Sequence, residues 1–192
     1  MNPIFQTALR ITWGLLLLYW LWSARTAKRP SMAEPVFKQI VMYWLPLIAA
    51  VLHLGPGEWF GHNILREQFV SHSIFAQSVG LAVCVAGAFL ACWSRYLLGT
   101  NWSSVVELKH DHELIENGPY KHVRHPIYAG LLTLFFGNAI LVGDWRGLIA
   151  VAIIFASFWR KLRLEEQWLT QQFGNRYRDY VNRTKALVPG IL

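Results

Sequence analysis

Five long apolar segments, separated by shorter polar ones, make up most of this chain. They cover residues 4–24, 36–54, 74–98, 126–142 and 145–173. Because about 17 to 25 apolar residues are needed for an α-helix to cross a bilayer, each segment is predicted to be a membrane-spanning helix. Pro46 lies inside the second segment and predicts a kink there. Gly143 and Asp144 predict a tight turn between the last two segments.

The fifth segment is longer than a membrane crossing requires. As an α-helix, its roughly 29 residues would extend about 43 Å, whereas the hydrocarbon core of a bilayer is about 30 Å thick. Charged residues fill its second half, and the segment is followed by Gly174, a residue type that commonly ends helices. We therefore expect the last turns of this helix to project from the membrane into water.

The polar segment 99–125 is too long to be a simple turn between two helices, and we expect it to have structure of its own. Within it, residues 105–108 and 113–115 have strand-like composition and flank the turn-like sequence Lys109-His110-Asp111-His112. This pattern predicts a short hairpin or flap.

The composition agrees with a membrane protein: 54% of the residues are hydrophobic and 15% are charged. The formal net charge is +7, but the basic residues lie between apolar segments, which argues against a nucleic-acid partner. Arg25, Lys28 and Arg29 follow the first segment in place of a small-residue cleavage site, so an uncleaved first span is expected. Cys84 and Cys92 lie within one apolar segment and are expected to be packing residues.

The distribution of basic residues predicts the orientation of the chain. Of the 18 Lys and Arg residues, Arg10, Arg66 and Arg146 lie at one side of the five predicted spans, and the others lie at the opposite side. Lys and Arg are enriched on the cytoplasmic side of membrane proteins. We therefore expect an all-α integral membrane protein of about five spans, with its N-terminus outside and its C-terminus in the cytoplasm. Residues 1–98 would form a three-span scaffold and 99–192 a catalytic half of one membrane domain.

The last two spans are expected to bring two polar groups together. His125 precedes the turn at Gly143 by 18 residues, and 18 residues after Trp145 is Arg163. In an antiparallel helix pair, residues 124–128 and 163–166 should therefore lie at the same depth, on the cytoplasmic side. Glu165 and Glu166 alone would suit a solvated helix face. Convergence with His, Tyr and Arg at a membrane edge instead indicates a site for a polar, charged cofactor.

These residues also carry a family resemblance. It rests on Leu98-Gly99-x-x-Trp102, on His112-x-Leu114-Ile115-x-x-Gly118-Pro119-Tyr120-x-x-Val123-Arg124-His125-Pro126-x-Tyr128-x-Gly130, on Glu165-Glu166, and on Phe173-Gly174-x-x-Tyr177-x-x-Tyr180. In this order the motifs resemble the isoprenylcysteine carboxyl methyltransferase and phospholipid methyltransferase superfamily. The resemblance covers roughly the C-terminal half of the chain. It implies an integral membrane enzyme that takes S-adenosylmethionine from the cytosol and methylates a lipophilic acceptor from the bilayer.

The resemblance also implies the site residues. The positions that match the cofactor-contacting residues of the superfamily, with Glu166 beside them, are His112, Leu114, Ile115, Tyr120, His125, Pro126, Ile127, Tyr128, Glu165 and Glu166. Lys161 stands where the prenylcysteine enzymes have a basic residue that serves the substrate. Arg124, Arg163 and Lys161 are the candidates for positioning the acceptor.

The acceptor itself is left open by the sequence. A carboxylate is already anionic and would need only positioning, whereas an amine would need a base such as His122, His125 or a Glu. A lipophilic thiol or alcohol is a further possibility. The alternatives to a methyltransferase are an NADPH-dependent oxidoreductase like the membrane sterol reductases, and a non-catalytic membrane module. No metal site is predicted, because no acidic or Cys ligands complete a set with His110, His112, His122 and His125.

Overall fold

A computed structural model describes residues 1–26, 30–102, 107–109 and 113–192, with only the backbone described for 30–33 and 107–109. The elements are α1 (Pro3–Ala24), β1 (Pro30–Ala33), α2 (Val36–Gln39), the π-helix η1 (Ile40–Trp44), α3 (Leu45–Leu54), the 3-10 turns η2 (Gly57–Phe60) and η3 (Ile64–Arg66), α4 (Ile74–Leu98), η4 (Gly99–Asn101), β2 (Glu107–Lys109), η5 (Gly118–Lys121), α5 (Pro126–Val142), α6 (Trp145–Phe173) and α7 (Asn175–Arg183). All five predicted helical segments are confirmed. The second one contains the π-helix directly before Pro46.

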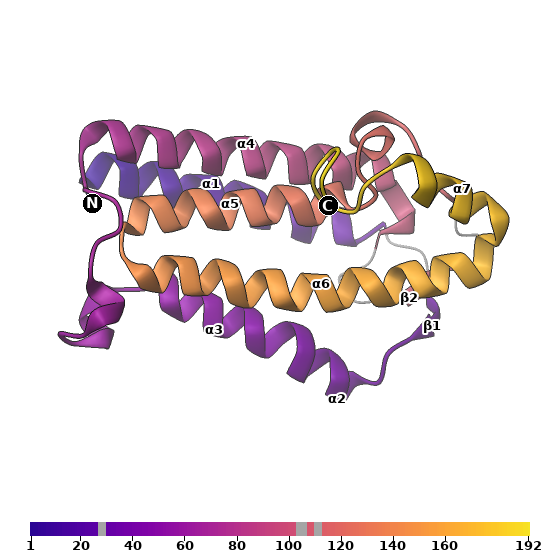
Figure 1. The fold of residues 1–192 in the computed structure, drawn as a ribbon, viewed down its shortest axis with the longest axis horizontal. Coiled ribbons are helices and arrows are strands. Elements are labelled where there is room, and N and C mark those ends of the chain that lie inside the picture. Colours follow the sequence, from indigo (N-terminus) through magenta and orange to yellow (C-terminus); the bar gives the residue numbers. More distant parts are fainter. Residues whose placement is uncertain (27–29, 103–106, 110–112) are drawn as a thin grey trace.

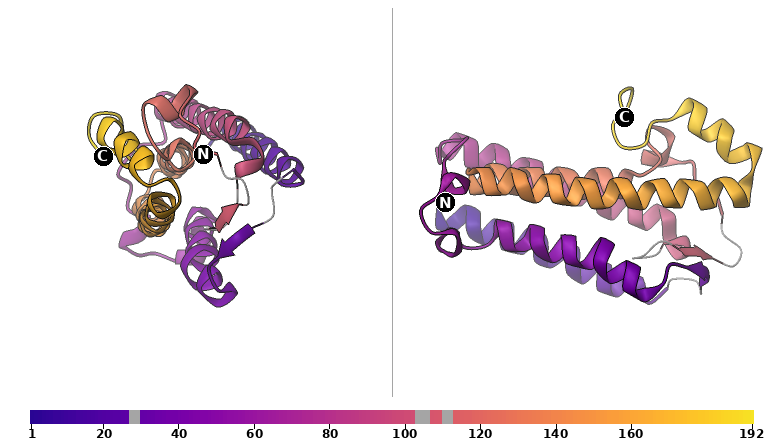
Figure 2. Two further views of the ribbon diagram at one scale, coloured as in Figure 1. Left: turned by 90° about the vertical axis from the view of Figure 1, so that its right-hand side faces the viewer. Right: turned by 60° about the horizontal axis from the view of Figure 1, so that its bottom comes forward.

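The helices form a bundle elongated along their common direction, and α6 continues past the ends of its neighbours (Figure 1). Helices α1, α4 and α5 lie on one side of α6, whereas α3 packs against its opposite side and α2 lies beyond α3 (Figure 2). The short helix α7 follows the turn at Gly174 and folds back over the projecting end of α6. The extension of α6 beyond the bundle confirms the length argument made from the sequence.

Glycines allow α4 and α5 to pack at very short distance. A Cβ atom on Gly87 would lie 2.4 Å from the backbone N of Leu134, and one on Gly137 would lie 2.5 Å from the backbone N of Cys84. Small residues permit such backbone contact between helices in membranes. Cys84 is buried at this contact and Cys92 packs against the same apolar cluster, so both are packing residues, as predicted.

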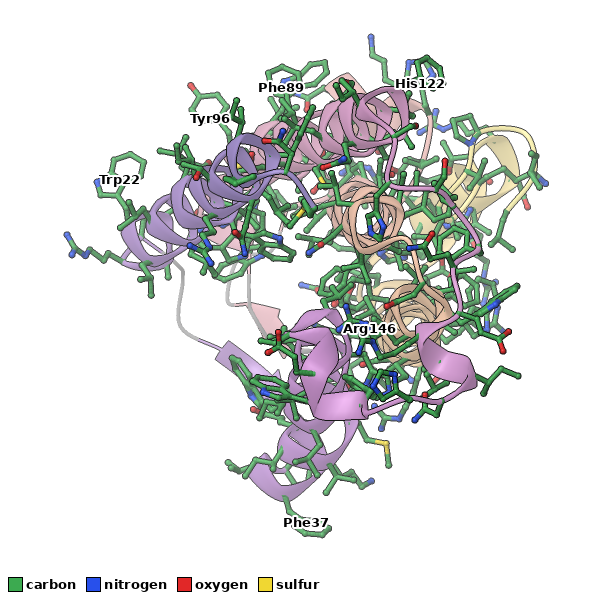
Figure 3. All side chains as sticks on the ribbon, turned by 90° about the vertical axis from the view of Figure 1, so that its left-hand side faces the viewer. Trp22, Phe37, Phe89, Tyr96, His122 and Arg146 are labelled. Carbon is green, nitrogen blue, oxygen red and sulfur yellow. The ribbon has the colours of Figure 1, made fainter. Side chains whose placement is uncertain are left out.

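Within the described residues, three helical segments are long and apolar enough to cross a membrane: Pro3–Ala24, Val36–Leu54 and Ile74–Asn101. Helix α5 is also apolar but has 17 residues. Many large apolar side chains cover the outside of the bundle, and Figure 3 shows Trp22, Phe37, Phe89 and Tyr96 pointing away from it. An exposed apolar surface of this kind is typical of a helical protein embedded in lipid.

The polar segment between α4 and α5 differs from the predicted hairpin. Strand β2 pairs antiparallel with β1, with Ala33 opposite Glu107 and Pro30 opposite Lys109. Residues 113–115 are not in a strand. The strand partner therefore comes from the connection after α1, a long-range pairing that local strand propensity does not reveal. Residues 103–106 and 110–112 of the expected hairpin lie outside the described part of the chain.

Candidate functional site

The site lies where α5 begins and α6 leaves the bundle. Tyr128, in the first turn of α5, donates a hydrogen bond from its hydroxyl to the carboxylate of Glu165 on α6. Arg124 and His125 lie just before α5, and both contact Glu166, the residue after Glu165. The predicted alignment of 124–128 with 163–166 is thus confirmed. Counting along an antiparallel hairpin was sufficient because both helices are regular and a two-residue turn joins them.

His125 lies between the two glutamates. Its Nδ1 is 3.5 Å from Oε2 of Glu165, and its Nε2 is 3.3 Å from Oε1 of Glu166. The ring is stacked against Tyr128 with 5.6 Å between centroids, and only 7% of the residue is exposed. A neutral imidazole has one N–H, so both carboxylates receive a hydrogen bond only when the ring carries two protons.

The charges of this group stabilise one another. Burial alone would lower the pKa of His125, but its hydrogen bonds to Glu165 and Glu166 outweigh burial, and the pKa is raised above its ordinary value. Burial alone would raise the pKa values of both glutamates, yet the hydrogen bonds and positive charge of His125 lower them, together with the charge of Lys161 at Glu165 and Arg124 at Glu166. Both effects favour the form in which an imidazolium lies between two carboxylates.

Arg124 connects this group to the C-terminal tail. Its Nε is 2.7 Å from Oε1 of Glu166, and its NH1 donates to the carbonyl oxygen of Thr184 at 2.5 Å. The backbone N–H groups of Arg124 and His125 donate to the carbonyls of Lys185 and Ala186, at 2.8 and 3.0 Å. The tail therefore runs beside the residues that precede α5 and covers the site on that side.

The other predicted cofactor-contacting residues surround this group in different ways. Tyr120 is buried, donating to the carbonyl of Ser94 at 3.3 Å and accepting from Tyr180 at its own carbonyl at 2.6 Å. Pro126 and Ile127 are buried at the start of α5. Leu114 and Ile115 are half-buried in the segment before η5, and His112 lies outside the described residues. The contact of each with a cofactor stays a prediction.

The candidate acceptor residues on α6 have different surroundings. Lys161 is 6% exposed, and its Nζ is 5.3 Å from the ring centroid of Tyr128. Arg163 is exposed on another face of the helix. His122, named above as a candidate base, points away from the bundle (Figure 3). The structure thus brings Lys161, but not His122, to the ring that contacts Glu165.

Two further residues near the site were not among the sequence candidates. Tyr43, in η1, has its ring centroid 5.3 Å from Nζ of Lys161. Glu34, before α2, is buried and forms an ion pair with Arg160 at 2.9 Å. The predicted kink at Pro46 was a signal that the helix is irregular near Tyr43, but no local pattern connects residues 34–43 with 160–161, more than 110 positions later.

Comparison with known proteins identifies relatives of this chain. The chain is 28% identical to the Schizosaccharomyces pombe protein-S-isoprenylcysteine O-methyltransferase over 159 residues, which are 78% of this chain and 67% of that protein. It is 27% identical to protein-S-isoprenylcysteine O-methyltransferase B of Arabidopsis thaliana over 115 residues, 58% of either chain. The corresponding enzyme of Saccharomyces cerevisiae is 28% identical over 134 residues, 64% of this chain and 56% of the yeast one. In the last two matches the chain spans less than two thirds of the relative.

A family model also matches more than half of the chain. The model described as phospholipid methyltransferase matches residues 75–176, from the start of α4 to the start of α7. The predicted superfamily and the methyltransferase class of enzyme are confirmed by these matches, which do not support the reductase alternative. The matched region contains α4, α5 and α6 and therefore all of His125, Tyr128, Glu165 and Glu166. This chain belongs to the phospholipid methyltransferase family.

Proposed function

We propose that this protein is an integral membrane methyltransferase that transfers a methyl group from S-adenosylmethionine to the carboxylate of a prenylcysteine-type acceptor. The observation that carries the proposal is His125, held between Glu165 and Glu166 beside the ring of Tyr128. The names of the relatives, which are isoprenylcysteine O-methyltransferases, support the same class of acceptor. The proposed site faces the cytosol, from which the cofactor arrives.

The side chains at this site fit S-adenosylmethionine, which supplies an electrophilic methyl group on a positively charged sulfur. Glu165 has a side chain that is 23% exposed, and its carboxylate has acceptor capacity beyond its bonds to Tyr128 and His125. It would accept hydrogen bonds from ribose hydroxyls or from the ammonium group of the cofactor. The Tyr128 hydroxyl, which donates to Glu165, would hold this carboxylate in place for the cofactor.

The surroundings of His125 favour a carboxylate acceptor over an amine. An amine must lose a proton to react, which requires a base with a free lone pair. Each ring nitrogen of His125 faces a carboxylate, which favours the doubly protonated ring, and the pKa values of Glu165 and Glu166 are lowered. None of these three groups is therefore an effective base. A carboxylate acceptor is already ionised at pH 7, and the buried ammonium group of Lys161 would hold it beside Tyr128.

The proposed topology has five spans. Among the described residues, three helices meet the length and composition expected of a span, and α5 at 17 residues is about 25 Å long, close to the thickness of the hydrocarbon core. The apolar first half of α6, residues 145–159, runs antiparallel to α5 as the fifth span. The excess of Lys and Arg at one end of the bundle supports a cytoplasmic site and C-terminus, with the N-terminus outside.

Calorimetric titration of the detergent-solubilised protein tests the cofactor. We expect micromolar binding of S-adenosylhomocysteine and no binding of NADPH. Glu165→Gln should weaken binding about 10- to 100-fold, the range for loss of a charged hydrogen bond. Tyr128→Phe should weaken it less, because the ring stays and only the hydroxyl that positions Glu165 is lost. The exposed residues Glu58 and Tyr96 provide the matched controls Glu58→Gln and Tyr96→Phe, which should bind normally. Binding of NADPH alone, or full affinity in both site variants, would contradict the proposal.

Methyl transfer from radiolabelled S-adenosylmethionine tests the acceptor. We expect the wild-type protein to methylate N-acetyl-S-farnesylcysteine but not phosphatidylethanolamine in mixed micelles. Lys161→Met should raise KM for the prenylcysteine with little change in affinity for S-adenosylhomocysteine. The exposed Lys38 provides the control variant Lys38→Met. Methylation of the lipid amine alone would overturn the choice of a carboxylate.

A further inference from the structure

Pro46 shapes the helix that faces the site. A proline has no backbone N–H, so the carbonyl of Met42, four residues earlier, lacks its usual α-helical donor. The hydroxyl of Ser157 on α6 donates a hydrogen bond to this carbonyl at 2.7 Å. In the same turn, the N–H of Leu45 donates to the carbonyl of Ile40, five residues back, which is the π-helical pattern. The π-turn is thus attached to α6, and it carries Tyr43.

Tyr43 lies against two successive cations of α6. Its ring centroid is 5.5 Å from Cζ of Arg160 and 5.3 Å from Nζ of Lys161. The Nζ of Lys161 is also 5.3 Å from the centroid of Tyr128. Cations and aromatic rings therefore alternate from Arg160 through Tyr43 and Lys161 to Tyr128, which contacts Glu165 and His125.

Glu34 lies at the Arg160 end of this series. Its Oε1 is 2.9 Å from NH2 of Arg160, and its Oε2 accepts a hydrogen bond from the hydroxyl of Tyr43. The same hydroxyl accepts from NH1 of Arg160 at 2.8 Å. Burial raises the pKa of Glu34, but the hydrogen bonds from Arg160 and Tyr43 outweigh it and lower the pKa, so Glu34 is ionised at neutral pH. The three residues form a closed triangle of charge-assisted hydrogen bonds.

The triangle gives the two neighbouring cations different surroundings. The guanidinium of Arg160 is held by Glu34 and the Tyr43 hydroxyl, on the side of the ring series that is remote from Glu165. Lys161 lies between the two rings and faces Tyr128. Without Glu34, Arg160 would be a long, flexible cation one residue from Lys161, and the site would attract anions of higher charge.

We propose that Glu34 and Tyr43 are specificity-determining residues that withdraw Arg160 from the acceptor site and fix Lys161 against Tyr128, so that headgroups with one negative charge are preferred over dianions. The inference rests on the proposed function, which it deepens. It assigns a role to residues of the first half of the chain that precede the family match, which begins at residue 75.

Two farnesyl ligands that differ in headgroup charge test the proposal: S-farnesylthioacetic acid, a monoanion, and farnesyl monophosphate, mainly a dianion at pH 7.5. Calorimetry measures the binding of each to the detergent-solubilised protein without turnover. Wild type should prefer the monoanion. In Glu34→Gln, affinity for the phosphate should rise about five- to tenfold relative to that for the carboxylate, about the effect of one partly screened charge.

Tyr43 variants separate the hydroxyl from the ring. Tyr43→Phe keeps a ring beside Lys161 but removes the bridge between Glu34 and Arg160, so selectivity should shift in the same direction as in Glu34→Gln. Tyr43→Leu should also raise KM for N-acetyl-S-farnesylcysteine with less effect on kcat, because Lys161 loses one of its two rings. Affinity for S-adenosylhomocysteine should stay unchanged in all three variants.

The outcomes distinguish this inference from the proposed function. Equal changes for the two farnesyl anions in Glu34→Gln and Tyr43→Phe would overturn the specificity role, whatever the catalytic result. Failure of wild type to bind S-adenosylhomocysteine, with charge selectivity intact, would overturn the proposed function and leave an anion-selective site. Glu58→Gln, at an exposed position in η2, controls for loss of an acidic side chain and should change neither ligand preference.

Discussion

The Nδ1 atom of His125 lies 3.5 Å from Oε2 of Glu165, although 40 residues and a complete helical hairpin separate the two along the chain. The opposite ring nitrogen faces Glu166 at 3.3 Å. This arrangement places the imidazole ring between two carboxylates, where α5 begins and α6 leaves the bundle, and favours its protonated form. It stabilises the docking of the two helices, and it presents Glu165 toward the place proposed for the cofactor.

We expect the stability conferred by His125 and its two glutamates to fall both at high pH and at low pH. Its raised pKa means that its contribution is complete below the ordinary His value of about 6.5 and is lost as pH rises through the folded value. The pKa values of Glu165 and Glu166 are lowered. Their contribution to stability is therefore complete above the ordinary Glu pKa of about 4.3 and is lost as pH falls through the folded pKa values. The stabilisation should therefore be greatest between about pH 4.3 and 6.5.

Thermal unfolding in detergent over pH 3.5 to 9 measures this effect. The Tm difference between wild type and His125→Gln should be widest in that window and narrow towards both extremes. The exposed residue His122 gives the control His122→Gln, which should follow wild type at every pH. A Tm difference that is constant across the range would mean that His125 contributes only through packing.

Close packing of α4 on α5 predicts a different response at two helical glycines. A Cβ on Gly87 would lie 2.4 Å from a backbone nitrogen and 2.6 Å from the carbonyl oxygen of Gly130, so Gly87→Ala must push the helices apart. We expect a loss of about 1 to 3 kcal/mol of stability, the cost typical of overpacking. Gly14→Ala in α1 meets nothing within 4 Å and should be neutral or slightly stabilising. Tm measurements on both variants decide this, and equal values would contradict the packing.

The sequence predicted the parts of this structure that depend on local pattern. Segment hydrophobicity located the helices, and the turn at Gly143 fixed the register that joins Tyr128 to Glu165. Residues 30–33 and 107–109, by contrast, pair across more than 70 positions. Neither partner has a local signal for the other, so the predicted hairpin was wrong.

The contribution of the first half of the chain to the site could not be predicted from the sequence either. The family resemblance begins with residues of α4, and Tyr43 belongs to no motif. Its place next to Lys161 follows from Pro46 and Ser157, because the freed carbonyl of Met42 is bonded by a residue on α6. A proline in a helical pattern predicts an irregularity, but only the packed structure shows which partner replaces the missing hydrogen bond.

The end of the bundle opposite the site should affect stability without affecting the cofactor. Arg146 points into the bundle (Figure 3), donates from Nε to Asp144 Oδ1 at 2.8 Å, and also donates to the carbonyl of Gly55. Asp144→Ala would leave this buried guanidinium without its carboxylate, which typically costs about 3 to 5 kcal/mol. We expect a strongly lowered Tm but unchanged calorimetric affinity for S-adenosylhomocysteine at low temperature. A parallel loss of affinity would mean that the two ends of α6 are coupled.

The tail that covers the site depends on Arg124, and this gives the last prediction. Arg124 contacts Glu166 with Nε and the carbonyl of Thr184 with NH1, two directions that match the spread donors of the planar guanidinium. Arg124→Lys keeps the charge but replaces two separate guanidinium nitrogens by one ammonium nitrogen on a flexible stem, which weakens the paired contacts. We expect faster amide hydrogen exchange in residues 184–187, measured by mass spectrometry, and about three- to tenfold weaker binding of S-adenosylhomocysteine. Arg178→Lys, on the exposed face of α7, is the matched control and should change neither. If exchange rises while affinity is unchanged, the tail covers the site without shaping it. If exchange is unchanged, Arg124 does not hold the tail.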